Sequence, residues 1–420
     1  MFESAYRQRL DADLARWQAD RVITAATVDA IRAALPPAPK SINIPTVIGI
    51  LGGLLIAAAF LAFVAANWTA IARPARFLVL LAGIAGAYGL GAWFDRSNRP
   101  YLADISATVG SIVFGASIAL VGQMYHLSDD FAGGLMLWAL GALIAAALTG
   151  SRGALAVALA AGCFWSGVRV SEAADVPHLP FVAFWLFAAW LAVAWSGAVA
   201  RHLVGIAALG WLATIFFAYV DRSAFNPVLP LAGCIALLLG GGLMLATLAS
   251  GALRALGLTL STYASFALAL LMAPVGIAEY LSQTRAAPNW ALLSGLAGTV
   301  LAFVAAAVTR RAGPGFAGLA LAFALIVASG SAGTLALPQP WSAYAIALAS
   351  MLCLVISGML DDVRPRIVAG WLGLGLMIAG ITWAVRGSLL RRAAFLAVAG
   401  IVAVVLATAL SRLVPKEAVR

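Results

Sequence analysis

The segment VGQMYHLSDD, residues 121–130, concentrates polar side chains in a strongly apolar region. An amide, a phenol, an imidazole and two carboxylates fall within eight positions, at Gln123, Tyr125, His126, Asp129 and Asp130. Imidazole and carboxylate groups are common general acids and bases, and both bind metals. The segment therefore predicts one of three things: an active site, a metal site, or a polar loop between two membrane helices.

Motif spacing favours the loop. His126, Asp129 and Asp130 form a five-residue run that matches no known zinc spacing, and His178 and His202 are distant in sequence. The phosphate-loop, nucleophile-elbow and His-Glu-x-x-His signatures are absent from the sequence. We therefore predict no metal and no cofactor, and we assign no catalytic residue.

The aspartates have two interpretations. One is structural: Ser128, Asp129 or Asp130 caps the next helix and places a carboxylate at its positive end. The other is a polar cluster at the outer face, in which Arg73 and Arg76 of the preceding loop meet the aspartates. Such a cluster would clamp the two loops or bind a zwitterionic headgroup.

Gln123 precedes this loop and lies within the apolar run, so we expect it to be a buried amide. Gln123 and His126 are three residues apart, which places them on one face if the helix continues.

The composition identifies the elements that must position these residues. Of 420 residues, 64% are hydrophobic and only 10% are charged, with a mean hydropathy of +1.01. Soluble proteins keep about a quarter of their residues charged. Apolar runs of about 18 residues or more, the length that crosses a bilayer as a helix, recur along the chain. We predict an all-α, polytopic integral membrane protein, because the short alternating strands of a barrel are absent.

The apolar runs predict about fourteen transmembrane helices between residues 41 and 411. Pro274 and Gly276, late in the ninth, mark the best candidate for a broken helix. The expected limits are 46–66, 77–94, 105–124, 133–149, 154–170, 181–200, 203–220, 230–250, 255–274, 291–309, 316–336, 342–360, 368–385 and 393–411.

The net charge of +10 is scattered through short loops, which fits the positive-inside rule better than nucleic-acid binding. With a cytoplasmic N-terminus, eighteen of the 26 Lys and Arg residues fall on the cytoplasmic side. The strongest exception is RGSLLRR at 386–392, which makes the last two spans the weakest part of the count. Residues 412–420 form a cytoplasmic tail.

Residues 1–40 predict a soluble, cytoplasmic helical hairpin with a proline-rich linker at 36–39. Thr24 fits the N-cap of its second helix, which carries an apolar stripe at Val28, Ile31 and Leu35. The first helix carries its stripe at Tyr6, Leu10, Leu14 and Trp17. Neither helix can bury its stripe alone, so Leu10, Leu14 and Trp17 are candidate residues for binding a protein partner.

Acidic residues and lysines are missing from the middle of every predicted span. All 16 acidic residues lie in loops, at span edges or in residues 1–40. This argues against a proton relay and leaves an apolar or lipidic substrate open. The 41 glycines favour close helix packing over unwound helices. Cys163, Cys234 and Cys353 lie in separate apolar runs and fit packing roles.

The first 150 residues resemble a bacterial family. The most specific pieces are Trp17 followed by RVIT at 21–24, then Gly122 to His126, and Trp138 beyond. This pattern is similar to the domain-of-unknown-function family 2157, a set of predicted bacterial membrane proteins. The resemblance implies a multi-pass protein of the bacterial inner membrane and no assigned activity.

Three functions remain open at this point. The first is transport or flipping of an apolar or lipidic substrate. The second is a noncatalytic sensor or scaffold that binds a partner through residues 1–40. The third is an enzyme that acts on lipid-linked substrates at the outer face. Membrane lipids are expected partners in all three, and nucleic acid in none.

Overall fold

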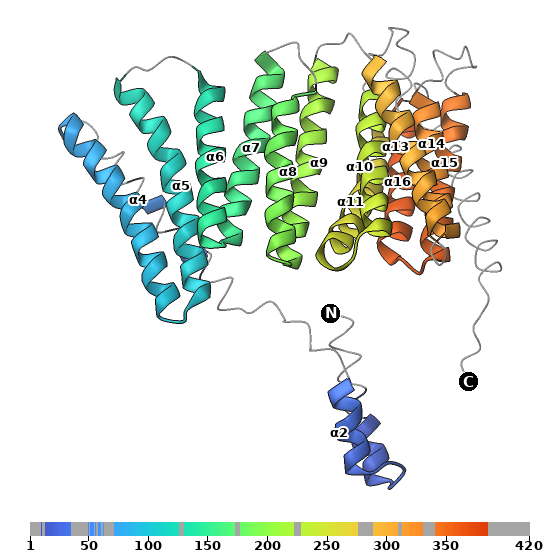
Figure 1. The fold of residues 1–420 in the computed structure, drawn as a ribbon. Coiled ribbons are helices and arrows are strands. Elements are labelled where there is room, and N and C mark those ends of the chain that lie inside the picture. Colours follow the sequence, from blue (N-terminus) through green and yellow to red (C-terminus); the bar gives the residue numbers. More distant parts are fainter. Residues whose placement is uncertain are drawn as a thin grey trace.

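The computed structural model describes residues 10, 13–34, 49, 51–53, 55, 58–59, 62, 71–125, 130–172, 177–221, 228–275, 289–309, 313–330 and 341–384. Every regular element in these residues is an α-helix (Figure 1). The helices are α2 (Ala25–Ala34), α4 (Arg73–Arg96), α5 (Pro100–Tyr125), α6 (Phe131–Thr149), α7 (Arg152–Glu172), α8 (Leu179–Ala194), α9 (Ala198–Asp221), α10 (Val228–Leu248), α11 (Gly251–Val275), α13 (Asn289–Val308), α14 (Gly313–Gly330), α15 (Trp341–Leu360) and α16 (Arg364–Ala384).

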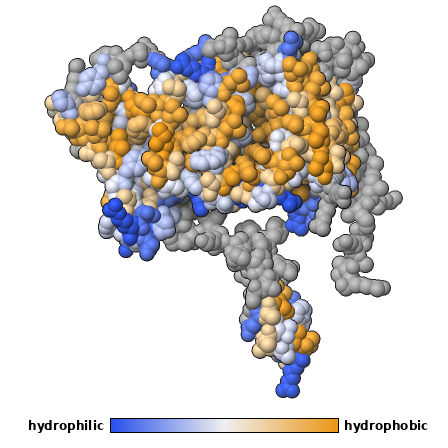
Figure 2. All heavy atoms as spheres, in the orientation of Figure 1, coloured by the Kyte–Doolittle hydropathy of each residue, from blue (hydrophilic) through white to orange (hydrophobic). Residues whose placement is uncertain are grey.

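The described helices confirm an all-α protein with several membrane spans. Nine of them are long and apolar enough to cross a bilayer, and the apolar parts of α8, α14 and α15 are shorter. Figure 2 shows an apolar band across the bundle with hydrophilic residues at its edges. Twelve predicted spans coincide with α4 to α16. The predicted span 393–411, and most of 46–66, lie outside the described residues, so the count of fourteen stays a prediction.

The helix ends define two faces. On the short-turn face, successive helices are joined by residues 97–99, 150–151, 195–197, 249–250, 309–312 and 361–363. On the long-loop face, they are joined by residues 126–130, 173–178, 222–227, 276–288 and 331–340. Neighbouring helices in the chain run in opposite directions between these faces (Figure 1).

Three of the short turns share one backbone feature, a left-handed conformation at the middle residue. Asn98, Ser196 and Asp362, the middle residues of three-residue turns, have positive φ angles of 55°, 51° and 52°. A left-handed residue just past a helix satisfies the last carbonyl groups and stops the helix sharply. In the turn after α15, Val363 N donates to Gly358 O at 2.8 Å. The chain can therefore reverse within three residues.

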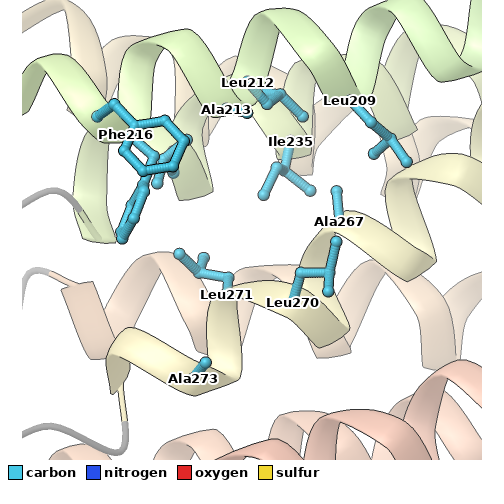
Figure 3. Close-up of a pocket in the computed structure, with 11 residues that line it drawn as sticks. Leu209, Leu212, Ala213, Phe216, Ile235, Ala267, Leu270, Leu271 and Ala273 are labelled. Carbon is cyan, nitrogen blue, oxygen red and sulfur yellow. The ribbon is translucent and has the colours of Figure 1, made fainter.

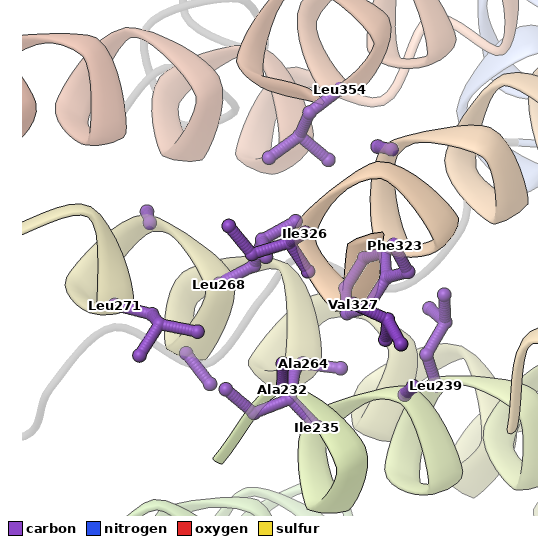
Figure 4. Packing of buried hydrophobic residues seen from close by; sticks show 14 of the residues in the cluster. Ala232, Ile235, Leu239, Ala264, Leu268, Leu271, Phe323, Ile326, Val327 and Leu354 are labelled. Carbon is purple, nitrogen blue, oxygen red and sulfur yellow. The ribbon is translucent and has the colours of Figure 1, made fainter. Parts of the chain in front are cut away.

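The helices form two packed groups. Helices α4 to α9 appear in chain order across the bundle in Figure 1, and α7 also packs directly against α5 and α9. Helix α10 packs between α11 and α13, and α11 contacts α16. One hydrophobic cluster lies among α6 to α9 and the facing residues of α11. A second joins α9 to α10, α11 and α13 to α16, and Figure 4 shows its centre. Helices α9 and α11 contribute to both clusters.

Small residues set the closest helix approach, as predicted. A Cβ added at Gly240 of α10 would overlap the carbonyl of Gly298 in α13, and one at Gly298 would overlap the backbone of Ala236. Gly242 and Gly257 bring α10 and α11 together in the same way. These contacts are backbone against backbone, which small residues permit in a membrane.

The N-terminal segment contains α2 and a helical stretch at residues 13–19. Leu14 and Val28 are buried, Leu10 is half-buried and Trp17 is exposed. Thr24 Oγ1 accepts a hydrogen bond from Thr27 N at 3.2 Å, which confirms its predicted capping role. The hairpin as a unit, its partner and the domain limits 1–40, 41–411 and 412–420 stay predictions.

Candidate functional site

Asp130 connects two helices at the long-loop face. Its Oδ1 accepts a hydrogen bond from Gly133 N at 2.8 Å, so it caps α6. The same oxygen lies 3.1 Å from Nη2 of Arg169 in α7. The capping interpretation is thus confirmed for Asp130, but its ionic partner is Arg169, whereas the sequence pointed to Arg73 and Arg76. Arg76 donates through Nε to Ile71 O at 2.7 Å.

The remaining members of the predicted polar cluster do not converge on Asp130 in the described part of the chain. Gln123 and Tyr125 are both exposed in the last turn of α5, and Met124 between them is buried. The expectation of a buried amide at Gln123 is therefore wrong, because its side chain faces away from the neighbouring helices. His126 and Asp129 lie outside the described residues, as does the side chain of Arg73.

A different group surrounds Arg169. Nη1 of Arg169 lies 3.3 Å from Oε2 of Glu172. Trp165 is four residues before Arg169, hence on the same face of α7. The ring of His178, the residue before α8, meets the Trp165 ring edge-on with centroids 4.7 Å apart. We call Asp130, Trp165, Arg169, Glu172 and His178 the Arg169 cluster.

The electrostatics of the cluster favour a neutral imidazole. Burial lowers the pKa of His178 below its ordinary value of 6.5, and the positive charge of Arg169 lowers it further. With neutral His178, the cluster has two carboxylates and one guanidinium.

Several buried polar atoms nearby lack hydrogen-bond partners. Among the described residues, Trp165 Nε1, Ser166 Oγ, His178 Nδ1 and Trp211 Nε1 are buried and unpartnered. Trp211 of α9 stacks on Phe181 of α8, with ring centroids 5.9 Å apart. Buried polar groups in proteins are nearly always hydrogen-bonded, so these unpartnered atoms on α7, on α9 and just before α8 make the region a candidate site.

An apolar cavity lies between α9, α10 and α11 (Figure 3). Its volume is about 290 Å³, and every side chain that lines it is apolar. Phe217 and Leu270 are exposed, so the cavity is open toward the lipid on that side. Other lining residues include Leu212, Phe216, Ile235, Ala267 and Leu271.

The cavity occupies the half of these helices nearer the long-loop face. It is lined by residues 209–217 of α9, 231–235 of α10 and 267–273 of α11. Helix α11 ends at Val275, so Pro274 lies in its last turn, close to the cavity. The site can bind an apolar group, and its lining offers a charged substrate nothing to pair with.

Arg366 is a buried cation that the sequence did not reveal. Its side chain is 2% exposed and pairs with Asp361 at 2.5 Å. The guanidinium also lies over the Phe316 ring, 5.6 Å from its centroid. Ser357 Oγ, 3.5 Å from Arg366 Nη1, donates to Gly315 O at 2.7 Å. Arg366 therefore ties α14, α15 and α16 together at the short-turn face.

No metal-binding group of three His, Cys, Asp or Glu residues forms among the residues that the structure describes. His126 and Asp129 are outside that set. Cys163, Cys234 and Cys353 are free thiols on α7, α10 and α15.

The segment from before α2 to the start of α7 matches a known protein family. Residues 15–155 match the model of a family described as predicted membrane protein (DUF2157). This confirms the resemblance over about a third of the chain. No curated protein and no solved structure matches the chain.

Within the matched segment, Trp138 has a packing role. Its Nε1 donates to Ser111 O at 2.9 Å, and its ring lies against Gly115 of α5. The cavity and most of the Arg169 cluster lie beyond residue 155, so the family match does not cover them.

Proposed function

We propose that this protein binds the apolar chain of a lipidic molecule between α9, α10 and α11 and moves that molecule within or across a bacterial inner membrane. The observation that carries the proposal is the wholly apolar, lipid-open cavity in that position. Its volume of about 290 Å³ is at the lower end for ligand sites, which suits part of a chain better than a whole lipid.

The charge pattern supports a lipidic substrate over an ion. The acidic and basic groups in the described spans lie near helix ends, and several of them have partners. Asp104 of α5 accepts hydrogen bonds from Ser151 Oγ and from Gly153 N at the start of α7, for example. A coupling ion or charged substrate at mid-membrane would need such a group there.

The length of α8 favours lipid movement beside α9. Helix α8 has 16 residues, which corresponds to about 24 Å at the usual helical rise. A bilayer core is about 30 Å thick, and a shorter helix thins the membrane next to it. A thinner core lowers the barrier that a lipid headgroup meets when it crosses.

The proposed orientation places the short-turn face in the cytoplasm. The described cations at that face include Arg96, Arg99, Arg152, Arg201 and Arg254. At the long-loop face they are Arg73, Arg76 and Arg169. This excess follows the positive-inside rule and supports a cytoplasmic location for α2.

The test is transbilayer movement of a fluorescent phospholipid in proteoliposomes. The wild-type protein should accelerate the movement over protein-free vesicles. Ala213→Trp, which places an indole in the cavity, should return the rate to that background. Ile206→Trp is the matched control, since Ile206 is exposed on the same face of α9 but does not line the cavity. Equal rates for Ala213→Trp and wild type would refute the proposal.

A further inference from the structure

The guanidinium of Arg169 is held between two carboxylates at the long-loop end of α7. Its Nη2 faces Asp130 at 3.1 Å, and its Nη1 faces Glu172 at 3.3 Å. The three side chains are 39%, 51% and 46% exposed, so they border the solvent or headgroup layer. A ligand arriving from that layer meets charges of both signs.

One turn deeper, a hydrogen-bond donor lacks an acceptor. Trp165 is only 6% exposed, and its Nε1 has no partner among the described residues. An indole N–H donates and never accepts, so the missing partner is an acceptor. His178, whose ring contacts the Trp165 ring, also has a buried, unpartnered Nδ1. Trp165 lies one helical turn before Arg169 on α7, and His178 contacts Trp165.

These two observations define complementary chemistry. An acceptor that bonds Trp165 and pairs with Arg169 is best supplied by an anion such as a phosphate ester. Asp130 and Glu172 oppose a simple anion and attract a cation. A ligand that satisfies both parts therefore carries a phosphate and an ammonium group in one molecule.

We infer that the Arg169 cluster binds a zwitterionic phospholipid headgroup, with the phosphate at Trp165 and Arg169 and the ammonium at Asp130 and Glu172. The cluster lies at the end of a membrane span, where headgroups are found. The inference rests on the proposed function, because it specifies the class of lipid handled by the protein. It concerns α6, α7 and the start of α8, and no residue of the cavity takes part.

The test compares three lipids with identical acyl chains by native mass spectrometry of the purified, full-length protein. The lipids are phosphatidylethanolamine, phosphatidylglycerol and diacylglycerol. Wild type should retain phosphatidylethanolamine about tenfold better than the other two, since a hydrogen-bonded charge pair is worth about that factor. Glu172→Gln should raise phosphatidylglycerol binding toward the level of phosphatidylethanolamine, because one of the two opposing carboxylates is gone.

Two further variants test the phosphate side. Arg169→Gln and Trp165→Phe should each reduce phosphatidylethanolamine binding, and the second keeps an aromatic ring in the packed position. Arg254→Gln is the control for loss of one cation, since Arg254 is exposed at the short-turn face. Glu172 is exposed, so Glu172→Gln keeps the test informative even if Trp165→Phe destabilises the fold.

The same experiment separates headgroup from free anion and from the cavity. Equal retention of the three lipids by wild type, or displacement of phosphatidylethanolamine by inorganic phosphate alone, would overturn the headgroup inference. Ala213→Trp should lower retention of all three lipids alike. If that loss occurs without headgroup preference, the inference fails and the proposed function stands. If the preference occurs without that loss, cavity binding fails.

Discussion

Arg366 shows how a single charge can hold three helices. Among the described residues, Arg366 is the only charged side chain that is fully buried. Its partners come from the ends of neighbouring helices. Taking a cation out of water is costly unless it is paired and hydrogen-bonded. Nη1 of Arg366 meets that requirement through Asp361 and Ser357, whereas its buried Nε has no partner among the described residues. Removal of Arg366 would leave Asp361 without its cation.

Arg366→Gln should therefore destabilise the protein strongly, by about 3–5 kcal/mol if the pair behaves like other buried pairs. Thermal unfolding in detergent measures the change. Arg364→Gln is the control, since Arg364 is exposed two residues earlier. Similar melting curves for the two variants would show that the buried pair contributes little.

His178 should make stability depend on pH. Its pKa is lowered in the folded protein by burial and by Arg169, so the fold binds this proton less well than the unfolded chain does. The contribution is constant above pH 6.5, and stability falls as the pH drops below that value. His178→Gln should lose this part of the acid sensitivity. Melting temperatures of both proteins over a pH series check it, and parallel curves would contradict it.

Local sequence predicts some of these residues and not others. The caps at Thr24 and Asp130 were predictable because capping depends on residues within one turn. The pair of Asp130 and Arg169 joins positions 39 residues apart, and it required knowledge that α6 and α7 lie side by side. The exposure of Gln123 likewise depends on where the neighbours of α5 lie.

At the scale of the helix, small residues decide which helices approach closely. Gly240 and Gly298 let α10 and α13 touch through their backbones, and Gly241 faces open space. Adjacent glycines in one helix thus have different roles, which gives a matched pair of substitutions.

Gly240→Ala should destabilise the protein by about 1–3 kcal/mol, because the added methyl group forces α10 and α13 apart. Gly241→Ala should be neutral or slightly stabilising, since alanine favours the helix. Thermal unfolding of the two variants provides the comparison. Equal effects at the two positions would contradict the packing role.

The sequence predicts where each helix lies along the chain much better than it predicts which helices pack against each other. Apolar length alone placed the twelve spans that became α4 to α16, because a bilayer requires a minimum helix length. The contacts of α10 with α13 and of α11 with α16 could not be predicted in that way. Lipid-facing and helix-facing sides are both apolar, so hydropathy does not distinguish them.

At the scale of the whole molecule, the two faces imply a labelling pattern. In a protein with Cys163, Cys234 and Cys353 replaced by Ala, Ser97→Cys and Ser250→Cys should be protected from a membrane-impermeant maleimide in intact cells. Cysteines at positions 128 and 283 should react. Labelling at position 97 but not at 128 would reverse the orientation.

The cavity is the feature that is hardest to predict from the sequence. Its lining consists of Leu, Ile, Ala and Phe residues, the same types that fill the helix contacts around it. Its existence depends on how α9 packs against α10 and α11, at the junction between the two hydrophobic clusters. The sequence indicated only that an apolar substrate would meet no charge at mid-membrane.

Photocrosslinking from a phospholipid with a diazirine within its acyl chain tests the central claim most directly. We expect adducts in the reconstituted protein to concentrate in residues 209–217 of α9, 231–235 of α10 and 267–273 of α11, and we expect Ala213→Trp to remove them. Adducts spread evenly over lipid-facing positions, including the exposed Phe164 of α7, would show instead that the chain does not enter the cavity.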